Sequence, residues 1–196
     1  MKPVARAALL GVLGIHLTSA HAGTVEGTVS VNGHPAARAV IALEGPAAAA
    51  LAAPRAHVVM DQRNLAFVPS VLPVLRGTII EFTNSDDVQH NVFSPSAAAG
   101  KFNLGTYGPG AARAVTLDTP GEVVVLCNIH MEMEARILVL DSPYFSTVGR
   151  DGHFRIAAVP PGSYSVRVWQ ERWLPTVQKL QVPANDSLTV NVVTQK

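Results

Sequence analysis

Three side chains able to bind a metal ion lie close together in the third quarter of the chain. Cys127, His130 and Met133, each separated from the next by two residues, occupy the segment VVVLCNIHMEMEARILV at 123–139. A thiolate, an imidazole and a thioether at this spacing can turn toward one point, and this soft donor set suits copper better than magnesium or calcium. Cys127 is the only cysteine in the chain, so the protein cannot form an internal disulfide.

A site of this kind needs a second imidazole, and His90 in the segment DDVQHNVFS is the best candidate. Two imidazoles and a thiolate in one plane, with a weak axial thioether, form a copper electron-transfer site. Met133 is expected in the axial position, although Met131 is another thioether and Glu132 or Glu134 would give a harder ligand. We therefore predict one copper ion per chain, and interpret the remaining histidines of the mature chain as surface residues: His34, His57 and His153.

Alternating strands must position this loop. Val123, Val125 and Cys127 share one face of the first strand, which places Cys127 at its end, above a valine-lined surface. Many short strands separated by Gly/Pro turns predict an all-β sandwich. We expect 94–109 to be a loop and 67–75 an irregular edge strand. Regular strands are expected at 23–30, 38–43, 57–60, 78–83, 88–93, 112–117, 122–126, 136–140, 153–156, 164–169, 177–182 and 188–193.

The combination of His90-Asn91 with Cys127-x-x-His130-x-x-Met133 resembles the cupredoxins, the blue copper proteins that include plastocyanin and amicyanin. The compact loop spacing is similar to that of amicyanin, and the resemblance covers roughly 57–140. It implies a Greek-key β-sandwich, one copper ion and single-electron transfer. His90, Cys127 and His130 would then be the equatorial ligands and Met133 the axial ligand. Asn91 matches the asparagine that follows the first ligand histidine, and we expect it to hold the ligand loop by hydrogen bonding.

The segments on either side resemble two halves of a carboxypeptidase-regulatory-like (transthyretin-like) β-sandwich. GTVEGTVSVNGHPAARAVIAL is similar to the start of that module, and VGRDGHFRIAAVPPGSYSVRVWQERW to its continuation. Our hypothesis is a cupredoxin sandwich inserted in a second, split sandwich; the alternative is a tandem in which the N-terminal strands pair with the cupredoxin sheet. The expected division is a signal peptide at 1–22, the split sandwich at 23–44 plus 143–196, an Ala/Pro linker at 45–56 and the cupredoxin domain at 57–142.

The N-terminus has the features of a secretory signal peptide. Lys2 and Arg6 precede a short apolar run, and Ala20-His21-Ala22 fits a small-x-small cleavage pattern. We therefore expect a periplasmic or secreted protein with no membrane span after cleavage. Removing the two cations changes the formal charge from +1 to −1, which gives no electrostatic reason to bind nucleic acid.

The leading hypothesis for function is an exported mononuclear type 1 copper protein that carries single electrons between transient redox partners. The alternative is copper sequestration or delivery without redox turnover. Catalysis of the copper nitrite reductase type needs a second, open copper site built from further histidines. We find no histidines spaced for such a site, so we do not expect an enzyme.

His130 is expected to expose a ring edge within an apolar docking patch of Ile129 and Met131. Trp169 is expected to pack in a core, with a partner surface as the alternative. The oligomeric state does not follow from the sequence.

Overall fold

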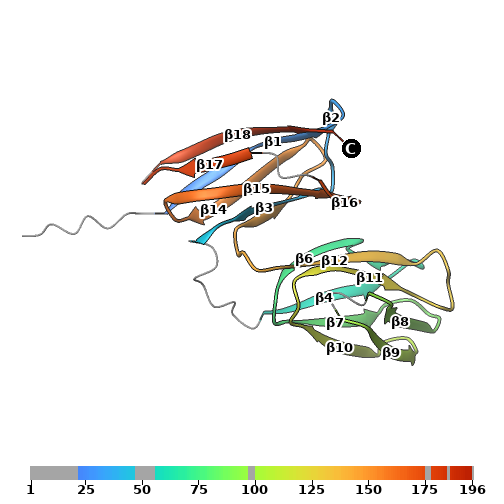
Figure 1. The fold of residues 1–196 in the computed structure, drawn as a ribbon. Helices are drawn as coiled ribbons and strands as arrows, with labels where there is room; N and C mark the ends of the chain where they lie inside the picture. Colours follow the sequence, from blue (N-terminus) through green and yellow to red (C-terminus); the bar gives the residue numbers. More distant parts are fainter. Residues whose placement is uncertain (1–21, 47–55, 97–99, 175–177, 185, 196) are drawn as a thin grey trace, which may run out of the picture.

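The computed structural model describes residues 22–46, 56–96, 100–174, 178–184 and 186–195. The elements in these ranges are β-strands arranged as two stacked sandwiches (Figure 1), which confirms the predicted all-β fold class. No helix among the described residues is long and apolar enough to cross a membrane. The expected signal peptide at 1–22 and linker at 45–56 lie almost wholly outside the described residues.

The outer domain, as we call the upper sandwich of Figure 1, is built from both ends of the chain. Its first sheet contains β1 (Gly23–Val31), β2 (His34–Pro35), β14 (His153–Val159) and β18 (Ser187–Thr194). Its second sheet contains β3 (Val40–Glu44), β13 (Phe145–Thr147), β15 (Gly162–Gln170), β16 (Arg172–Trp173) and β17 (Gln178–Val182). Alternate side chains of both sheets point inward and form one apolar core.

The inner domain, the lower sandwich of Figure 1, is built from the middle of the chain. One sheet contains β10 (Ala112–Leu117), β7 (Thr78–Asn84), β4 (His57–Gln62) and β5 (Phe67–Val68) in that order. The other contains β6 (Val71–Leu75), β12 (Glu134–Leu140), β11 (Gly121–Leu126), β8 (His90–Ser94) and β9 (Phe102–Tyr107). A second apolar core lies between these sheets and includes Cys127 and Met133.

The inner domain interrupts the outer one between β3 and β13. These two strands pair antiparallel, with Ala42 opposite Phe145, and β3 also pairs with β15. β1 likewise pairs with β14 and, in parallel, with β18. The N-terminal strands therefore complete the sheets of the C-terminal segment, which is the arrangement of an inserted sandwich. The residue boundaries assigned from the sequence stay a prediction.

One detail differs from the sequence prediction. The segment 94–109, expected to be a loop, contains β9, which pairs with β8 and places Tyr107 opposite His90. Its strand character is hidden by small residues and by Gly105, whose φ of 76° lies in the left-handed region. The Asn32-Gly33 turn has positive φ angles at both residues and joins β1 to the short β2. The next strand, β3, belongs to the opposite sheet.

A third apolar cluster joins the two domains. It contains Val40, Ala42 and Trp169 from the outer domain and Leu138 and Leu140 from the inner domain. The Trp169 indole N–H also donates a hydrogen bond of 2.9 Å to Glu122 Oε2 on β11. Trp169 is thus buried, as the sequence predicted, but it packs between domains rather than within one core. This contact fixes β12 on both of its faces.

We expect Trp169→Phe to lower the free energy of unfolding by about 1 kcal/mol, the usual contribution of one hydrogen bond. The phenyl ring keeps most of the apolar contact with Leu138 and Leu140, so the lost bond to Glu122 is the main change. Urea unfolding followed by far-UV circular dichroism measures the difference. A variant as stable as the parent would contradict a stabilising role for this contact.

Candidate metal centre

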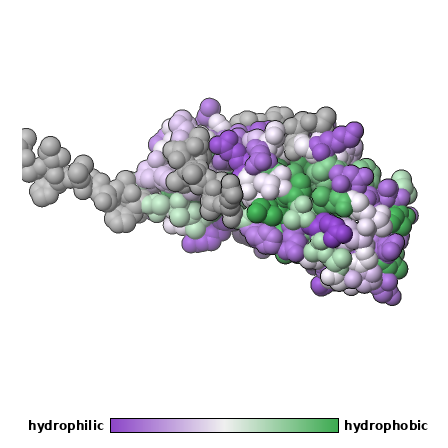
Figure 2. All heavy atoms as spheres, turned by 90° about the horizontal axis from the view of Figure 1, so that it is seen from below, coloured by the Kyte–Doolittle hydropathy of each residue, from purple (hydrophilic) through white to green (hydrophobic). Residues whose placement is uncertain are grey.

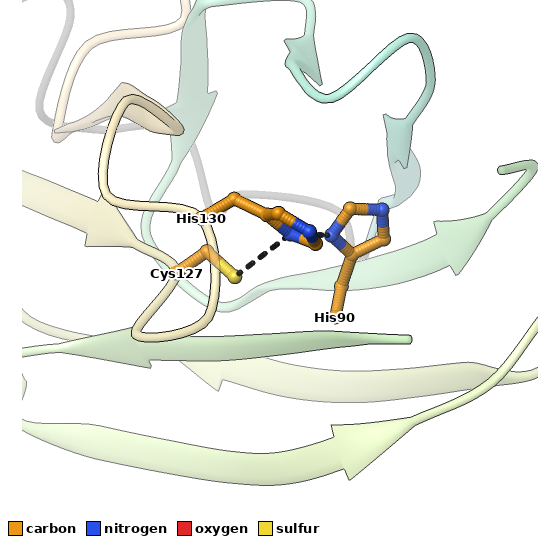
Figure 3. Close-up of side chains that lie close together, drawn as sticks. All are labelled: His90, Cys127 and His130. Carbon is orange, nitrogen blue, oxygen red and sulfur yellow. Dashed lines mark hydrogen bonds between the residues drawn. The ribbon is translucent and has the colours of Figure 1, made fainter. Parts of the chain in front are cut away.

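The donor-bearing residues come together at one end of the inner domain. His90 begins β8, and Cys127 directly follows β11, whose last residue pairs with Phe93 of β8. The loop between β11 and β12 then returns His130 to the same place. Figure 3 shows the side chains of His90, Cys127 and His130 pointing toward one another from these two segments. Their ligand atoms all lie within 4.8 Å of one another.

The loop is held closed by its own backbone. The Cys127 N–H donates to the Met133 carbonyl at 3.3 Å, and the Met133 N–H donates to the His130 carbonyl at 3.0 Å. Leu126 pairs with Glu134, so Cys127 and Met133 are the next cross-strand pair of the same ladder. Side chains of such a pair point to the same face of the sheet, with Cβ atoms about 5 Å apart. Both side chains are accordingly buried in the inner core.

The other expected candidates for the axial position point outward. Met131 is 79% exposed, and Glu132 is also exposed. Glu134 faces the opposite side of the sheet from Cys127 and forms an ion pair with Arg136. Of the four residues considered from the sequence, only Met133 therefore lies on the same face as the cysteine sulfur.

The two imidazoles face each other through their Nδ1 atoms, which lie 3.1 Å apart. The Cys127 Sγ is 4.0 Å from the same nitrogen of His130. His90 Nε2 lies 2.9 Å from Asp86 Oδ2, and an ionised carboxylate accepts hydrogen bonds only. In a neutral His90 ring the hydrogen is therefore on Nε2, and the Nδ1 lone pair points into the cluster.

These donors fit a single metal ion of copper size. Imidazole nitrogen and thiolate sulfur bind such ions at about 2.0 and 2.3 Å, so two of them on one ion lie at most about 4.3 Å apart. The distances of 3.1 and 4.0 Å satisfy that limit. The widest separation of the three donors is at most 4.8 Å, so closure needs a movement of about half an ångström. No second cluster of this kind occurs in the described part of the chain.

Burial differs between the two histidines. His90 is fully buried and Cys127 is 3% exposed, whereas His130 is partly exposed. The site is therefore closed on the side of the core and reaches the surface through one ring, as expected from the sequence. His34, His57 and His153 are exposed and lie outside the cluster, which agrees with their interpretation as surface residues.

The hydrogen bonds of Asn91 differ from expectation. Its side-chain amide donates to Asn103 Oδ1 across the β8–β9 pair at 3.1 Å, rather than to the loop of Cys127 and His130. The Oδ1 atom of Asn91 is buried and has no hydrogen-bond partner among the described residues. Asn91 therefore fixes β9 beside His90 instead of holding the ligand loop.

The contact between Asp86 and His90 was not predicted from the sequence. Asp86 lies four residues before His90, between the strands expected at 78–83 and 88–93. Burial opposes its ionisation, but the N–H groups of Leu65 and Asn64 and the His90 ring hold the pKa of Asp86 below its usual value. The group next to His90 is therefore a carboxylate at neutral pH. Its spacing from His90 was visible in the sequence, but the fold was needed to show the contact.

Tyr107 is a second missed neighbour of the site. Its hydroxyl accepts a 2.6 Å bond from Gln62 Nε2 and donates to the Phe82 carbonyl at 3.1 Å. Burial raises the pKa of Tyr107 to about 12; the Gln62 bond opposes that shift, and the charge of Cys127 adds to it. Because the folded state favours the neutral phenol, stability is expected to fall as pH rises past the unfolded value of about 10.

A spectrophotometric titration at alkaline pH should detect this residue directly. We expect a phenolate transition near pH 12 in the folded protein that is absent in Tyr107→Phe. Burial also raises the pKa of the other two tyrosines, Tyr144 and Tyr164, so the difference between the parent and Tyr107→Phe spectra assigns the transition. Ionisation of Tyr107 at the normal value of about 10 would contradict its buried, hydrogen-bonded position.

Comparisons with known proteins return the two families that the sequence resembles. The carboxypeptidase regulatory-like domain family matches residues 117–195, which is less than half of the chain. That match begins at the end of β10 and so includes inner-domain strands β11 and β12 as well as the C-terminal part of the outer domain. A comparison with curated proteins finds no match.

Cupredoxins are among the similar solved structures. A reduced mutant of amicyanin is 26% identical, with a TM-score of 0.40, over 53% of this chain and 99% of that chain. A purple cupredoxin from Nitrosopumilus maritimus is 20% identical, with a TM-score of 0.37, over 43% of this chain and 99% of that chain. A copper-containing nitrite reductase from Thermus scotoductus SA-01 is 28% identical, with a TM-score of 0.41, but the match spans 42% of this chain and only 22% of the reductase. The carboxypeptidase regulatory-like match and these partial structural similarities involve the same two classes of protein that the sequence resembles.

Proposed function

We propose that this protein binds one copper ion through His90, Cys127, His130 and Met133 and carries single electrons between redox partners. The observation that supports this proposal is the convergence of one thiol sulfur and one nitrogen from each of two imidazoles within 4.8 Å at a largely buried site. Such a mixed set suits both oxidation states of copper, and copper bound there would supply a one-electron couple.

The chain's own residues supply the fixed surroundings that rapid electron transfer needs. His90, Cys127 and Met133 are buried side chains anchored by β8, β11 and β12, and the backbone bonds of the loop hold His130 near them. Ligands that are fixed by the fold undergo little rearrangement when the charge of the metal changes. The partly exposed ring of His130 gives the electron a short route to the surface.

Partner docking is proposed at the end of the inner domain that carries the site. Exposed apolar side chains extend from three loops there: Leu65, Val88, Ile129 and Met131. The ladder pair Gln62–Asn84 and the bonds of Asp86 to residues 64 and 65 place the first two of these loops together. Figure 2 shows apolar atoms at this right-hand end of the molecule. A small apolar surface of this kind suits brief redox encounters.

Export is part of the same proposal. A single free cysteine in an oxidising compartment needs protection from oxidation, and metal binding with burial provides it. We propose a periplasmic or secreted mature protein that begins after Ala22. Mass spectrometry of the natively produced protein would identify its N-terminus, and retention of residues 1–22 would contradict cleavage.

Copper titration followed by visible spectroscopy and voltammetry tests the function. We expect one Cu(II) per chain, an intense thiolate-to-copper band, a reversible one-electron wave and fast self-exchange. A pale nitrogen and oxygen complex would overturn the type 1 site. Tight Cu(I) binding without reversible oxidation would overturn electron transfer and support sequestration or delivery instead.

A further inference from the structure

The contact between Asp86 and His90 links the candidate metal centre to a hairpin on the other sheet. His90 Nε2 lies 2.9 Å from Asp86 Oδ2, on the side of the ring opposite the Nδ1 that faces His130. The His90 side chain is fully buried and that of Asp86 is 11% exposed. The carboxylate therefore interacts with the ring in a place with little access for competing water.

Asp86 is itself held in place by the turn between β4 and β5. The Asn64 N–H donates to Asp86 Oδ1 at 2.6 Å, and the Leu65 N–H donates to Oδ2 at 3.0 Å. Both residues have positive φ angles, 54° and 56°, which turn their N–H groups toward the carboxylate. The Asp86 N–H also donates to Asn84 Oδ1 at 3.0 Å. The carboxylate thus has a fixed position before any ligand binds.

We propose that Asp86 is a positioning residue that fixes the tautomer of His90 and increases the donor strength of its Nδ1, with the 64–65 turn holding the carboxylate for that task. A carboxylate that accepts the hydrogen of one imidazole nitrogen makes the other nitrogen more electron-rich. A stronger donor stabilises Cu(II) more than Cu(I), so Asp86 lowers the reduction potential. This effect on the reduction potential rests on the proposed function, whereas the effect of Asp86 on the His90 tautomer does not depend on copper binding.

The chain offers a matched control for charge. Asp87 is the neighbouring residue, is exposed and takes part in none of these hydrogen bonds. Asp86→Asn and Asp87→Asn therefore remove the same charge at adjacent positions, and only the first changes the acceptor bound to His90. Any property that differs between the two variants therefore reflects the loss of the Asp86–His90 contact rather than the change in net charge.

The first measurement uses the metal-free protein. Long-range ¹H–¹⁵N spectra should show a single His90 tautomer with the hydrogen on Nε2 in the parent and in Asp87→Asn. In Asp86→Asn the population of the other tautomer should rise. A parent His90 with its hydrogen on Nδ1, or on both nitrogens at neutral pH, would overturn the proposal even if Asp86→Asn does not fold.

The second measurement uses the copper-loaded protein. We expect Asp86→Asn to weaken Cu(II) binding by about 10- to 100-fold relative to Cu(I), which raises the potential by about 59 mV per tenfold change. Asp86→Glu, which keeps the carboxylate, should recover part of that shift, and Asp87→Asn should match the parent. Equal potentials in Asp86→Asn and Asp87→Asn would overturn the tuning role. A parent without a type 1 spectrum would overturn the proposed function and leave the tautomer result intact.

Discussion

Replacing Cys127 with serine is expected to abolish the intense visible band of the copper-loaded protein. The band requires a thiolate bound to copper, and Cys127 is the only cysteine in the chain. Loss of a residue that only hydrogen-bonds to a ligand lowers metal affinity by up to about 100-fold. Loss of the ligand itself should lower copper affinity by more than that. Absorption spectra and competition with a chelator measure the two effects. Serine is close in size to cysteine, so the apolar core around the site is preserved.

Two methionine variants provide the controls on the same loop. Met131→Leu changes a side chain that is 79% exposed and should leave the spectrum unchanged. Met133→Leu changes a buried side chain beside Cys127 and should shift the band and the potential without removing copper. An unchanged intense band in Cys127→Ser would refute the site. A spectrum that changes in Met131→Leu and not in Met133→Leu would contradict the assignment of Met133 to the axial position.

Replacing Phe82 with alanine is expected to destabilise the inner domain by about 3–5 kcal/mol. Phe82 is fully buried on β7 and packs against the rings of Phe67 and Phe102. Its removal leaves a cavity between the two sheets, below the strands that carry His90 and Cys127. Urea unfolding of the metal-free protein measures the loss.

The matched control is Val59→Ala on β4, which is paired in parallel with β7. Val59 is 48% exposed, so its truncation should change stability by no more than about 0.5 kcal/mol. Copper at about 100 times its dissociation constant should restore about 2.7 kcal/mol in Phe82→Ala if the site survives. Equal stabilities of the two alanine variants would contradict the assignment of Phe82 to a close-packed core.

The sequence was sufficient for the features that depend on local pattern. Alternation in the β11 segment placed Val123, Val125 and Cys127 on one buried face, as the structure shows. The Cys127-x-x-His130 spacing and the distant His90 were identified from donor chemistry, and the fold brings their ligand atoms together. The assignment of these residues and Met133 as copper ligands stays a prediction.

Features that depend on distant contacts were not accessible from the sequence. The strand β9 was hidden by small residues and was revealed only by its pairing with β8. The acceptor for Trp169 lies on β11, in the other domain. Asp86 lies four residues from His90, but its position depends on N–H groups of Asn64 and Leu65, which are 22 and 21 residues earlier in the chain. One available signal was overlooked: the unbroken apolar runs at 40–43 and 137–140 indicate strands buried on both faces, which is where the domains meet.

The pairing of β3 with β13 means that the polypeptide leaves and re-enters the outer sandwich at neighbouring points. The Leu43 N–H donates to the Tyr144 carbonyl at this junction, and the Ser142 hydroxyl donates to the Leu43 carbonyl. A single proteolytic cut between β3 and β4 would not release the inner domain, because the connection between β12 and β13 still joins it to the outer domain. Rotation about a single connection is likewise prevented, so the end of the inner domain that carries the candidate metal centre keeps one orientation relative to the outer domain.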